Sequence, residues 1–368
     1  MIKKADLPYF YSMIIIIGAG LSGLLTAYRL KKAGIPFKIL EARDRIGGRI
    51  NTVYGTDITP VEMGATWFGN QHVHLRALLE ELGIEYFKQY MDRIVYYQAS
   101  PTSPTESVQI PIQAPSYRIS GGTSNLIHTL YQKLDENDII LNQSIKQIKS
   151  LGDSIQVITD KVYVGSQVVV AIPPKLWAKR ILFEPNLPAD LIQIAQQTHT
   201  WMEDSIKIAL TYKDPFWEAE GRSATLFSNA GPITELYDHC NSERTKFALC
   251  GFINSSFHQL DVAERRALVI AQIKSVFGPK AEDFLEYQEC VWSMEENTFE
   301  ASDIPHFPHQ NNGNQVFRHS YFGDKLLFSS SESASEFPGY MDGAVCSANL
   351  AASQIIASKI NPLERTDR

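Results

Sequence analysis

The sequence predicts an α/β fold that is built on a parallel sheet, with a second and smaller part beside it. Three observations near the N-terminus predict this fold. Residues 13–17 form an uninterrupted apolar run, which is typical of a strand buried on both faces of a parallel sheet. A glycine-rich turn follows at once, and leucines then recur at helical spacing as far as Gly34. A second short strand, residues 37–40, ends at the acidic residue Glu41.

Further elements are expected along the rest of the chain. Leucine spacing predicts a helix over 66–83, and the content of Pro and Ser predicts an extended loop over 99–120. Further helices are expected at 122–134, 263–277 and 341–359, and strands within 139–159 and at 168–172, 206–212 and 326–329.

Composition excludes several classes of protein. The chain has 368 residues, with 44% hydrophobic and 20% charged residues, which is a globular balance rather than a disordered one. This length fits two domains or one large composite, and it allows a large core. Lys and Arg number 34 against 41 Asp and Glu, which gives a net charge of −7. A nucleic-acid-binding role is therefore disfavoured.

Cysteine and histidine placement predicts no metal site. The four cysteines form no CxxC pair, and the histidines have no cysteine or carboxylate beside them at ligand spacing. This pattern is typical of a protein in a reducing compartment. No run of eighteen apolar residues occurs, and the apolar run near the N-terminus passes directly into a glycine motif. We therefore expect a cytoplasmic protein without a membrane span or a signal peptide.

The motif Gly18-Ala19-Gly20-Leu21-Ser22-Gly23 between the first strand and helix predicts a dinucleotide site. Gly18 allows the tight turn out of the strand, and Gly20 allows the backbone to approach a pyrophosphate. Gly23 allows the helix to pack closely on the sheet. The start of the helix offers free N–H groups and a partial positive charge to the phosphates.

Glu41 and the residues after it indicate which dinucleotide is bound. A carboxylate at the end of the second strand can accept hydrogen bonds from both ribose hydroxyls. Gly47 and Gly48 again allow the backbone to approach a ligand, and Arg49 can place a forked cation on phosphate oxygens. A nicotinamide site does not need this second loop, whereas a buried FAD does, so the sequence favours FAD.

At this point the sequence resembles the flavin-containing amine oxidases, of the monoamine oxidase type. Residues 14–24 and 40–49 resemble the N-terminal FAD signature of that family, and residues 64–67 resemble the segment that runs along its flavin. Further similar segments, in the order of the family, are residues 121–126, 205–217, 292–296 and 339–344.

The resemblance implies a Rossmann-like FAD-binding domain of the amine oxidase and glutathione reductase type, with a reduced substrate domain. The FAD-binding domain would comprise residues 1–70, 120–196 and 293–368, and the substrate domain residues 71–119 and 197–292. The implied reaction oxidises an amine to an imine by hydride transfer to flavin N5. Oxygen as the acceptor would yield hydrogen peroxide. The implied partners are a small-molecule amine and O₂, and the oligomeric state is not predicted.

Three residues are implied as catalytic: Lys207, which matches the family lysine that holds a water at N5, Trp292 near the ring, and Tyr340 on the substrate path. The residues alone leave another interpretation open, in which Lys207 lies on the solvent face of the strand at 206–212. The start of the helix at 341–359 is suited to stabilise the reduced flavin. The implied cofactor-binding residues are Gly18, Gly20, Leu21, Ser22, Gly23, Glu41, Ala42, Arg43, Gly48, Arg49, Gly64, Ala65, Thr66, Trp67, Ile145, Glu332, Gly339, Tyr340, Met341 and Ala344.

Departures from the family pattern bear on the cofactor and the substrate. Ala301 stands at the position of the cysteine that binds FAD covalently in monoamine oxidases, so non-covalent FAD is expected. Ser302 stands where the second aromatic residue of the substrate path is expected, and Phe299 or Phe307 could replace that residue. Glu332 is retained, although the small turn residues before it are not.

Two alternatives to an amine oxidase stay open. The short stretch between Trp67 and Gly121 and the serine at position 302 favour a related FAD-dependent oxidase or desaturase with a bulky or non-amine substrate. The other alternative is a binding protein that the flavin only stabilises. Lys207, Trp292 and Tyr340 argue against it, because such a protein has no need of them.

Overall fold

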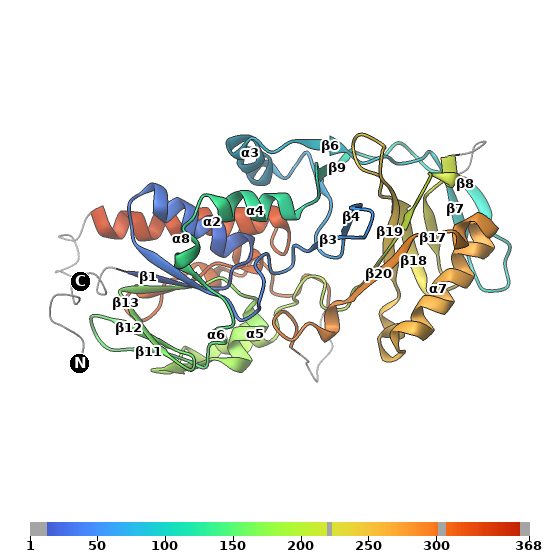
Figure 1. Ribbon diagram of the computed structural model, residues 1–368. Coiled ribbons are helices and arrows are strands. Elements are labelled where there is room, and N and C mark those ends of the chain that lie inside the picture. The colour runs from blue at the N-terminus through green and yellow to red at the C-terminus, as the bar shows by residue number, and fades with distance from the viewer. Residues whose placement is uncertain (1–12, 219–222, 301–306, 361–368) are drawn as a thin grey trace.

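The computed structural model describes residues 13–218, 223–300 and 307–360 and shows two units side by side (Figure 1). The first unit, at the left of the figure, holds a five-stranded sheet in the order β10-β2-β1-β14-β21. Its strands are β1 (Ile14–Ile17), β2 (Phe37–Leu40), β10 (Ile139–Ile140), β14 (Gln167–Val170) and β21 (Leu326–Phe328). Every neighbouring pair is parallel, which confirms the predicted α/β fold.

The parallel sheet is covered on both faces, and this explains the unbroken apolar run in β1. Ile14 and Ile16 join a core that also contains residues of the helices α2, α3, α4 and α8. Ile15 and Ile17 join the core on the opposite face. The helices on the first face are α2 (Leu21–Lys32), α3 (Val73–Leu82), α4 (Ser124–Gln132) and α8 (Met341–Ile360).

The opposite face is covered by a four-stranded sheet in the order β13-β12-β11-β15 and by two short helices (Figure 1). These elements are β11 (Gln147–Ser150), β12 (Ile155–Ile158), β13 (Val162–Gly165), β15 (Leu182–Glu184), α5 (Pro174–Arg180) and α6 (Ala189–Gln196).

The second unit is a seven-stranded sheet in the order β20-β16-β19-β18-β17-β7-β8. Its strands are β7 (Ile94–Gln98), β8 (Glu106–Gln109), β16 (Ile206–Tyr212), β17 (Leu226–Ser228), β18 (Ile233–Asp238), β19 (Phe247–Ile253) and β20 (Glu286–Val291). Helix α7 (Val262–Phe277) packs on one face, and the hairpin of β3 (Thr52–Tyr54) and β4 (Pro60–Glu62) packs on the other. Strand β16, which lies between β20 and β19, is consequently buried along its whole length.

Helix α7 begins with a capping box. The Asp261 side chain accepts a hydrogen bond from the backbone N–H of Glu264 at 2.9 Å, and the Glu264 carboxylate accepts one from the N–H of Asp261 at 3.2 Å. This reciprocal arrangement pairs two of the N–H groups that a helix start leaves free. Short 3-10 helices are η1 (Glu136–Asp138), η2 (Phe216–Glu218), η3 (Ser255–Gln259), η4 (Pro279–Glu282), η5 (Trp292–Met294), η6 (Gln315–Arg318) and η7 (Ser331–Ser333).

Two predicted elements are wrong in part. The helix expected over 66–83 begins only at Val73, because Phe68–Gly69 pairs as strand β5 with β9 (Ser116–Ile119). The loop expected over 99–120 contains β8 and β9, and β9 also pairs with β6 (Tyr86–Lys88). Strand pairing decides both cases: β5 and β9 pair across a long stretch of chain, and β8 pairs with β7 in a local hairpin.

The position of α3 bears on the division into domains. Leu75, Leu78 and Leu79 of α3 belong to the same hydrophobic core as α2 and α8. Of residues 71–119, only β7 and β8 join the seven-stranded sheet. We therefore propose a cofactor domain that includes α3 and a substrate domain built on the seven-stranded sheet. Among the described residues, no helix combines the length and the apolar character that crossing a membrane requires.

Candidate active site

An elongated pocket opens at the carboxyl ends of β1, β2 and β14, the place where ligands bind in open α/β sheets. It encloses about 1150 Å³, including space that is open to solvent at its mouth. Many of the predicted cofactor-binding residues line it: Gly18, Gly20, Leu21, Ser22, Glu41, Ala42, Arg43, Gly48, Arg49, Ala65, Ile145, Gly339, Tyr340, Met341 and Ala344. The other predicted residues are not among those that line the pocket: Gly23, Gly64, Thr66, Trp67, Lys207, Trp292 and Glu332.

Two glycine loops face each other across the start of α2. Gly20 and Gly47 form an isolated parallel bridge, and a Cβ atom on Gly48 would lie 3.3 Å from the Cα of Gly20. Gly48 also has a φ of 58°, a backbone conformation that glycine adopts more readily than residues with a Cβ atom. Helix α2 has no side-chain cap and no acidic residue in its first turn. Its free N–H groups and positive dipole end therefore suit a diphosphate.

Glu41 lies at the end of β2 with its carboxylate held in place by backbone N–H groups. One oxygen accepts a hydrogen bond from Ala19 N–H at 2.7 Å, and the other accepts one from Arg43 N–H at 2.9 Å. The side chain is almost fully buried. Each oxygen retains a further acceptor site, so the carboxylate can still receive ribose hydroxyls.

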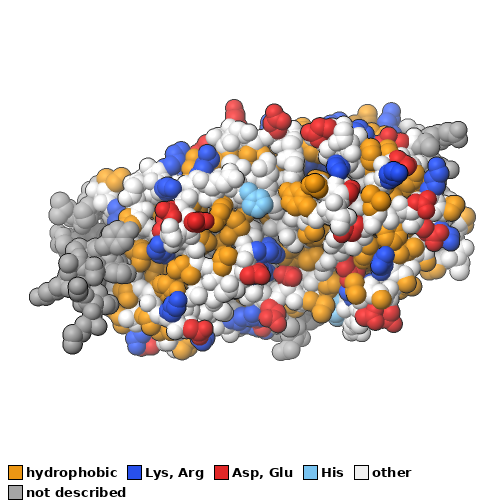
Figure 2. All heavy atoms as spheres, in the orientation of Figure 1, with side chains coloured by type: hydrophobic (Ala, Val, Ile, Leu, Met, Phe, Trp, Pro, Cys, Tyr) orange, Lys and Arg blue, Asp and Glu red, His pale blue; other side chains and the backbone are white. Residues whose placement is uncertain are grey.

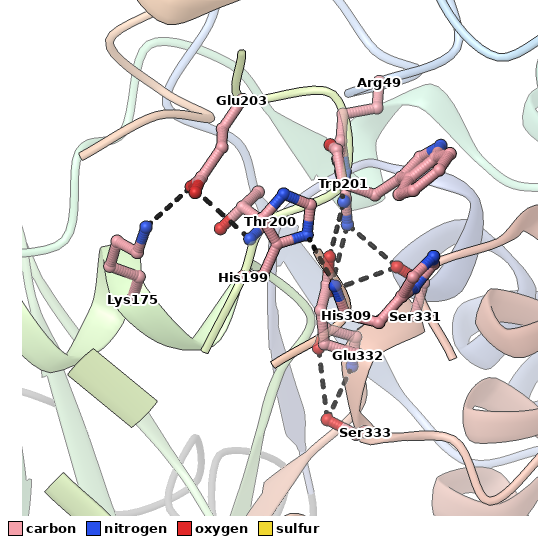
Figure 3. A network of polar contacts seen from close by, with 11 residues as sticks. Arg49, Lys175, His199, Thr200, Trp201, Glu203, His309, Ser331, Glu332 and Ser333 are labelled. Carbon is pink, nitrogen blue, oxygen red and sulfur yellow. Dashed lines mark hydrogen bonds and ion pairs between the residues drawn. The ribbon is translucent and has the colours of Figure 1, made fainter. Parts of the chain in front are cut away.

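Arg49 and Glu332 form a bidentate ion pair at the other end of the pocket (Figure 3). The Nη1–Oε1 distance is 2.5 Å and the Nη2–Oε2 distance is 3.1 Å. Arg49 Nη2 also donates to the Ser331 hydroxyl at 2.9 Å. Burial alone would raise the pKa of Glu332, but the charge and hydrogen bonds of Arg49 outweigh it and hold the pKa below its ordinary value. Arg49 is thus oriented by a partner that stays ionised.

Replacing Glu332 with glutamine should destabilise the fold by about 3–5 kcal/mol at neutral pH, since it leaves a partly buried guanidinium without its counter-charge. Because the folded-state pKa of Glu332 is lowered, its stabilisation is complete above the unfolded pKa of about 4.3. That stabilisation is lost as the pH falls through the folded-state pKa. Urea unfolding at several pH values should therefore show a difference between the proteins that is constant above about pH 5 and shrinks in acid. The exposed neighbour Glu336 supplies the control, Glu336→Gln, which should unfold like the parent protein.

Lys207 lies on β16, the second strand from one edge of the seven-stranded sheet, between β19 and β20, and is 1% exposed. Its Nζ donates to the Gly64 carbonyl at 2.5 Å and to the Thr66 hydroxyl. It also lies 5.0 Å from the ring centroid of Trp67 and 5.6 Å from that of Phe252. The interpretation of Lys207 as a solvent-facing residue is therefore wrong. Burial lowers the pKa of Lys207.

Trp292 and Glu62 hold the segment that receives Lys207. The indole N–H of Trp292 donates to the Met63 carbonyl at 2.7 Å. The Glu62 carboxylate accepts from Thr123 N–H at 2.6 Å and from the Thr52 hydroxyl at 2.9 Å. Burial raises the pKa of Glu62, although these bonds and the charge of Lys207 oppose the shift. Trp292 is fully buried and is not among the residues that line the pocket, so its role beside the flavin ring stays a prediction.

Tyr340 lines the pocket at the start of α8 and contacts two rings that the sequence did not indicate. Its ring centroid lies 5.3 Å from that of Trp201 and 5.8 Å from that of His309. Phe307, one candidate for the second aromatic position, is 79% exposed. Ala301 and Ser302 lie outside the described residues.

Sequence reasoning missed several residues that line the pocket. None of them belongs to a glycine motif, so spacing gave no indication of them; Trp201 lies five residues before the strand of Lys207. These residues are Gln143, Ser144, Arg180, Trp201, Met202, Asn297, Thr298, Ser330 and Ser331.

Comparison with known proteins agrees with this geometry. The family model described as flavin containing amine oxidoreductase matches residues 21–117 and 94–356. The chain is 24% identical to the "Probable flavin-containing monoamine oxidase A" of Dictyostelium discoideum, over 95% of this chain and 98% of that protein. It is also 24% identical to the putrescine oxidase of Kocuria rosea, over 94% of this chain and 95% of that protein.

Two solved structures share the fold. Putrescine oxidase bound to putrescine matches with a TM-score of 0.80 at 24% identity, covering 94% of this chain and 99% of that chain. Cyclohexylamine oxidase from Brevibacterium oxydans matches with a TM-score of 0.82 at 19% identity, covering 95% and 100%. The alignment with the Dictyostelium protein spans 453 positions, more than the 368 residues of this chain. That relative therefore carries segments that this chain lacks.

Proposed function

We propose that the chain, which belongs to the family of flavin-containing amine oxidoreductases, binds FAD without a covalent bond and oxidises an amine to an imine. One observation carries the proposal. Lys207 is buried in the second unit, yet it donates to Gly64 and Thr66, which flank Ala65 in the pocket wall. Burying a lysine costs free energy, and here its hydrogen bonds connect it to the wall of a pocket whose other end fits a dinucleotide.

The residues that line the pocket fit FAD. The uncapped start of α2 and the loop at Gly47 and Gly48 would receive the diphosphate, and Glu41 would receive the ribose hydroxyls. The flavin would lie toward Arg49, Ala65 and Tyr340, beside the start of α8. When bound, FAD would supply the hydride acceptor at N5, and O₂ would restore its oxidised form with release of hydrogen peroxide.

The protein's own groups would then prepare the amine. An amine must lose its proton before its carbon can release a hydride, and each pKa unit of that loss is worth about 1.4 kcal/mol. Ring faces such as those of Tyr340 and Trp201 exclude water and favour the neutral amine. We propose that Lys207 holds a water molecule at the flavin edge, because an ammonium group has three hydrogen-bond donors and the contacts with Gly64 and Thr66 use only two of them.

The visible absorbance spectrum of the purified protein tests the proposal. Spectra are recorded without oxygen before and after adding a panel of amines, and peroxide is assayed after air returns. Bleaching by one class of amines, followed by peroxide, is the expected result. A colourless protein would contradict FAD binding. A flavin that no amine bleaches would favour an oxidase or desaturase with a bulky substrate, which the segments missing relative to the Dictyostelium protein would leave room for.

Non-covalent FAD gives a separate prediction. Ala301 offers only a methyl group where the family's covalent thiol stands, so no sulfur is available there to bond the flavin. Precipitation with acid should therefore leave all yellow colour in the supernatant, and the protein pellet should show no flavin fluorescence. Colour that stays with the pellet would show a covalent bond elsewhere in the chain.

A further inference from the structure

Residues 198–204, which we call the strap, join α6 to β16 and form part of the pocket wall. Trp201 and Met202 of the strap line the pocket directly. Met202 has a φ of 75°, in the left-handed region that a residue with a bulky side chain rarely adopts. Such a conformation persists only where surrounding contacts fix it. The strap must therefore be held from outside.

A buried ion pair supplies that hold. Lys175 Nζ, on α5, lies 2.7 Å from Glu203 Oε2, and the side chains are only 2% and 9% exposed. The same carboxylate oxygen accepts a hydrogen bond from the backbone N–H of Thr200 at 3.4 Å (Figure 3). Glu203 therefore fixes the strap on both sides of Trp201 and Met202 to a single point on α5.

Weaker contacts complete the arrangement around Trp201. Arg49 Nη1 donates to the Trp201 carbonyl at 3.4 Å, and His199 N–H donates to the Gln310 carbonyl at 3.0 Å. The indole ring stacks on His309 with centroids 4.8 Å apart and lies beside Tyr340. The rings of Trp201, His309 and Tyr340 contact one another and form an aromatic wall from three separate segments of the chain.

Stability alone does not explain the Lys175–Glu203 pair. The free-energy cost of removing two charges from water is about as large as the free energy gained from their attraction. Two apolar side chains of similar size would therefore stabilise the fold equally well. An ion pair, however, accepts only one geometry and so selects one conformation of the strap. The ring faces of this wall suit the apolar carbon skeleton of an amine.

We propose that Lys175 and Glu203 are positioning residues, whose ion pair sets the Trp201 indole beside Tyr340 as the wall that the carbon skeleton of the substrate contacts. The substrate contact rests on the proposed function. The placement of Trp201 does not, and it can be measured in protein freed of flavin.

The first experiment measures the placement of Trp201. The difference in fluorescence between the protein with Trp201 and its Trp201→Phe variant reports this indole alone. The quenching of that fluorescence by acrylamide measures how exposed the indole is. In the Glu203→Gln background the quenching constant of Trp201 should rise about twofold, because the strap opens locally. The control is Lys274→Met, which removes an exposed ion pair with Glu282 on the far side of the second unit and should change nothing. An unchanged constant in Glu203→Gln would overturn the proposal.

The second experiment separates positioning from a structural role. In Glu203→Gln the KM for the amine found by the absorbance assay should rise about tenfold, with kcat nearly unchanged. The double variant Lys175→Met with Glu203→Gln leaves no charge unpaired, so its Tm should recover while KM stays high. A double variant that regains the parent KM would show that the pair is only structural and overturn the proposal. If no amine bleaches the parent flavin, the proposed function fails, and the quenching result still decides the placement.

Discussion

Replacing Lys207 with methionine should leave FAD bound and lower turnover by about 10²–10⁴-fold, the range for a group that positions or moves a proton. Methionine keeps the length of the side chain but cannot donate to the Gly64 carbonyl or the Thr66 hydroxyl. The water proposed to sit between Lys207 and the flavin would lose its partner. The phosphate and ribose contacts at the other end of the pocket would be unaffected.

Rapid mixing under anaerobic conditions measures which step is affected. Flavin bleaching by the amine and its recovery in oxygen are followed separately in Lys207→Met, and the amount of bound FAD is read from the starting spectrum. Lys213→Met is the matched control, because Lys213 directly follows the same strand and is exposed. Equal rates for the parent protein and Lys207→Met would remove Lys207 from the mechanism and leave its burial without a catalytic reason.

The burial of Lys207 shows where sequence reasoning stops. Alternation along β16 predicts that Ile206 and Ile208 share one face and Lys207 faces the other. It cannot say that the second face is also covered. That face is closed by the β3–β4 hairpin, which lies more than a hundred residues earlier in the chain and packs through Val61 and Met63. Only the resemblance to the family favoured the buried interpretation.

The dinucleotide end of the pocket could be predicted because its determinants are local. The strand, the glycine turn, the helix and Glu41 follow one another within a single β-α-β unit, so spacing alone fixes their geometry. The aromatic wall could not be predicted in this way. Trp201, His309 and Tyr340 come from three separate loops and helix ends, and an isolated aromatic residue is more often core than site.

Replacing Glu41 with alanine should weaken FAD binding by at least about a hundredfold, since hydrogen bonds to a charged group contribute about 1.5–3 kcal/mol each and two ribose hydroxyls lose their acceptor. The effect has a second source within the protein. The carboxylate also orders the glycine loop through Ala19 N–H and the following loop through Arg43 N–H. Without the carboxylate, both loops proposed to face the diphosphate lose a fixed hydrogen-bond partner. Ordering these loops would then reduce the binding free energy of FAD.

Titration of the flavin-free protein with FAD, followed by the quenching of flavin fluorescence, measures this effect. Asp44→Ala is the control, because Asp44 is an exposed acid in the same loop and should bind FAD like the parent protein. Glu41→Gln separates the two sources: the amide oxygen can still accept up to two hydrogen bonds, but the NH₂ group accepts none, so the side chain cannot serve both backbone N–H groups and both hydroxyls and should fall between the parent and Glu41→Ala. Parent-like affinity in Glu41→Ala would mean that the start of α2 and the Gly47–Gly48 loop hold the cofactor through its diphosphate alone, and that the acid serves only to shape the turn after β1.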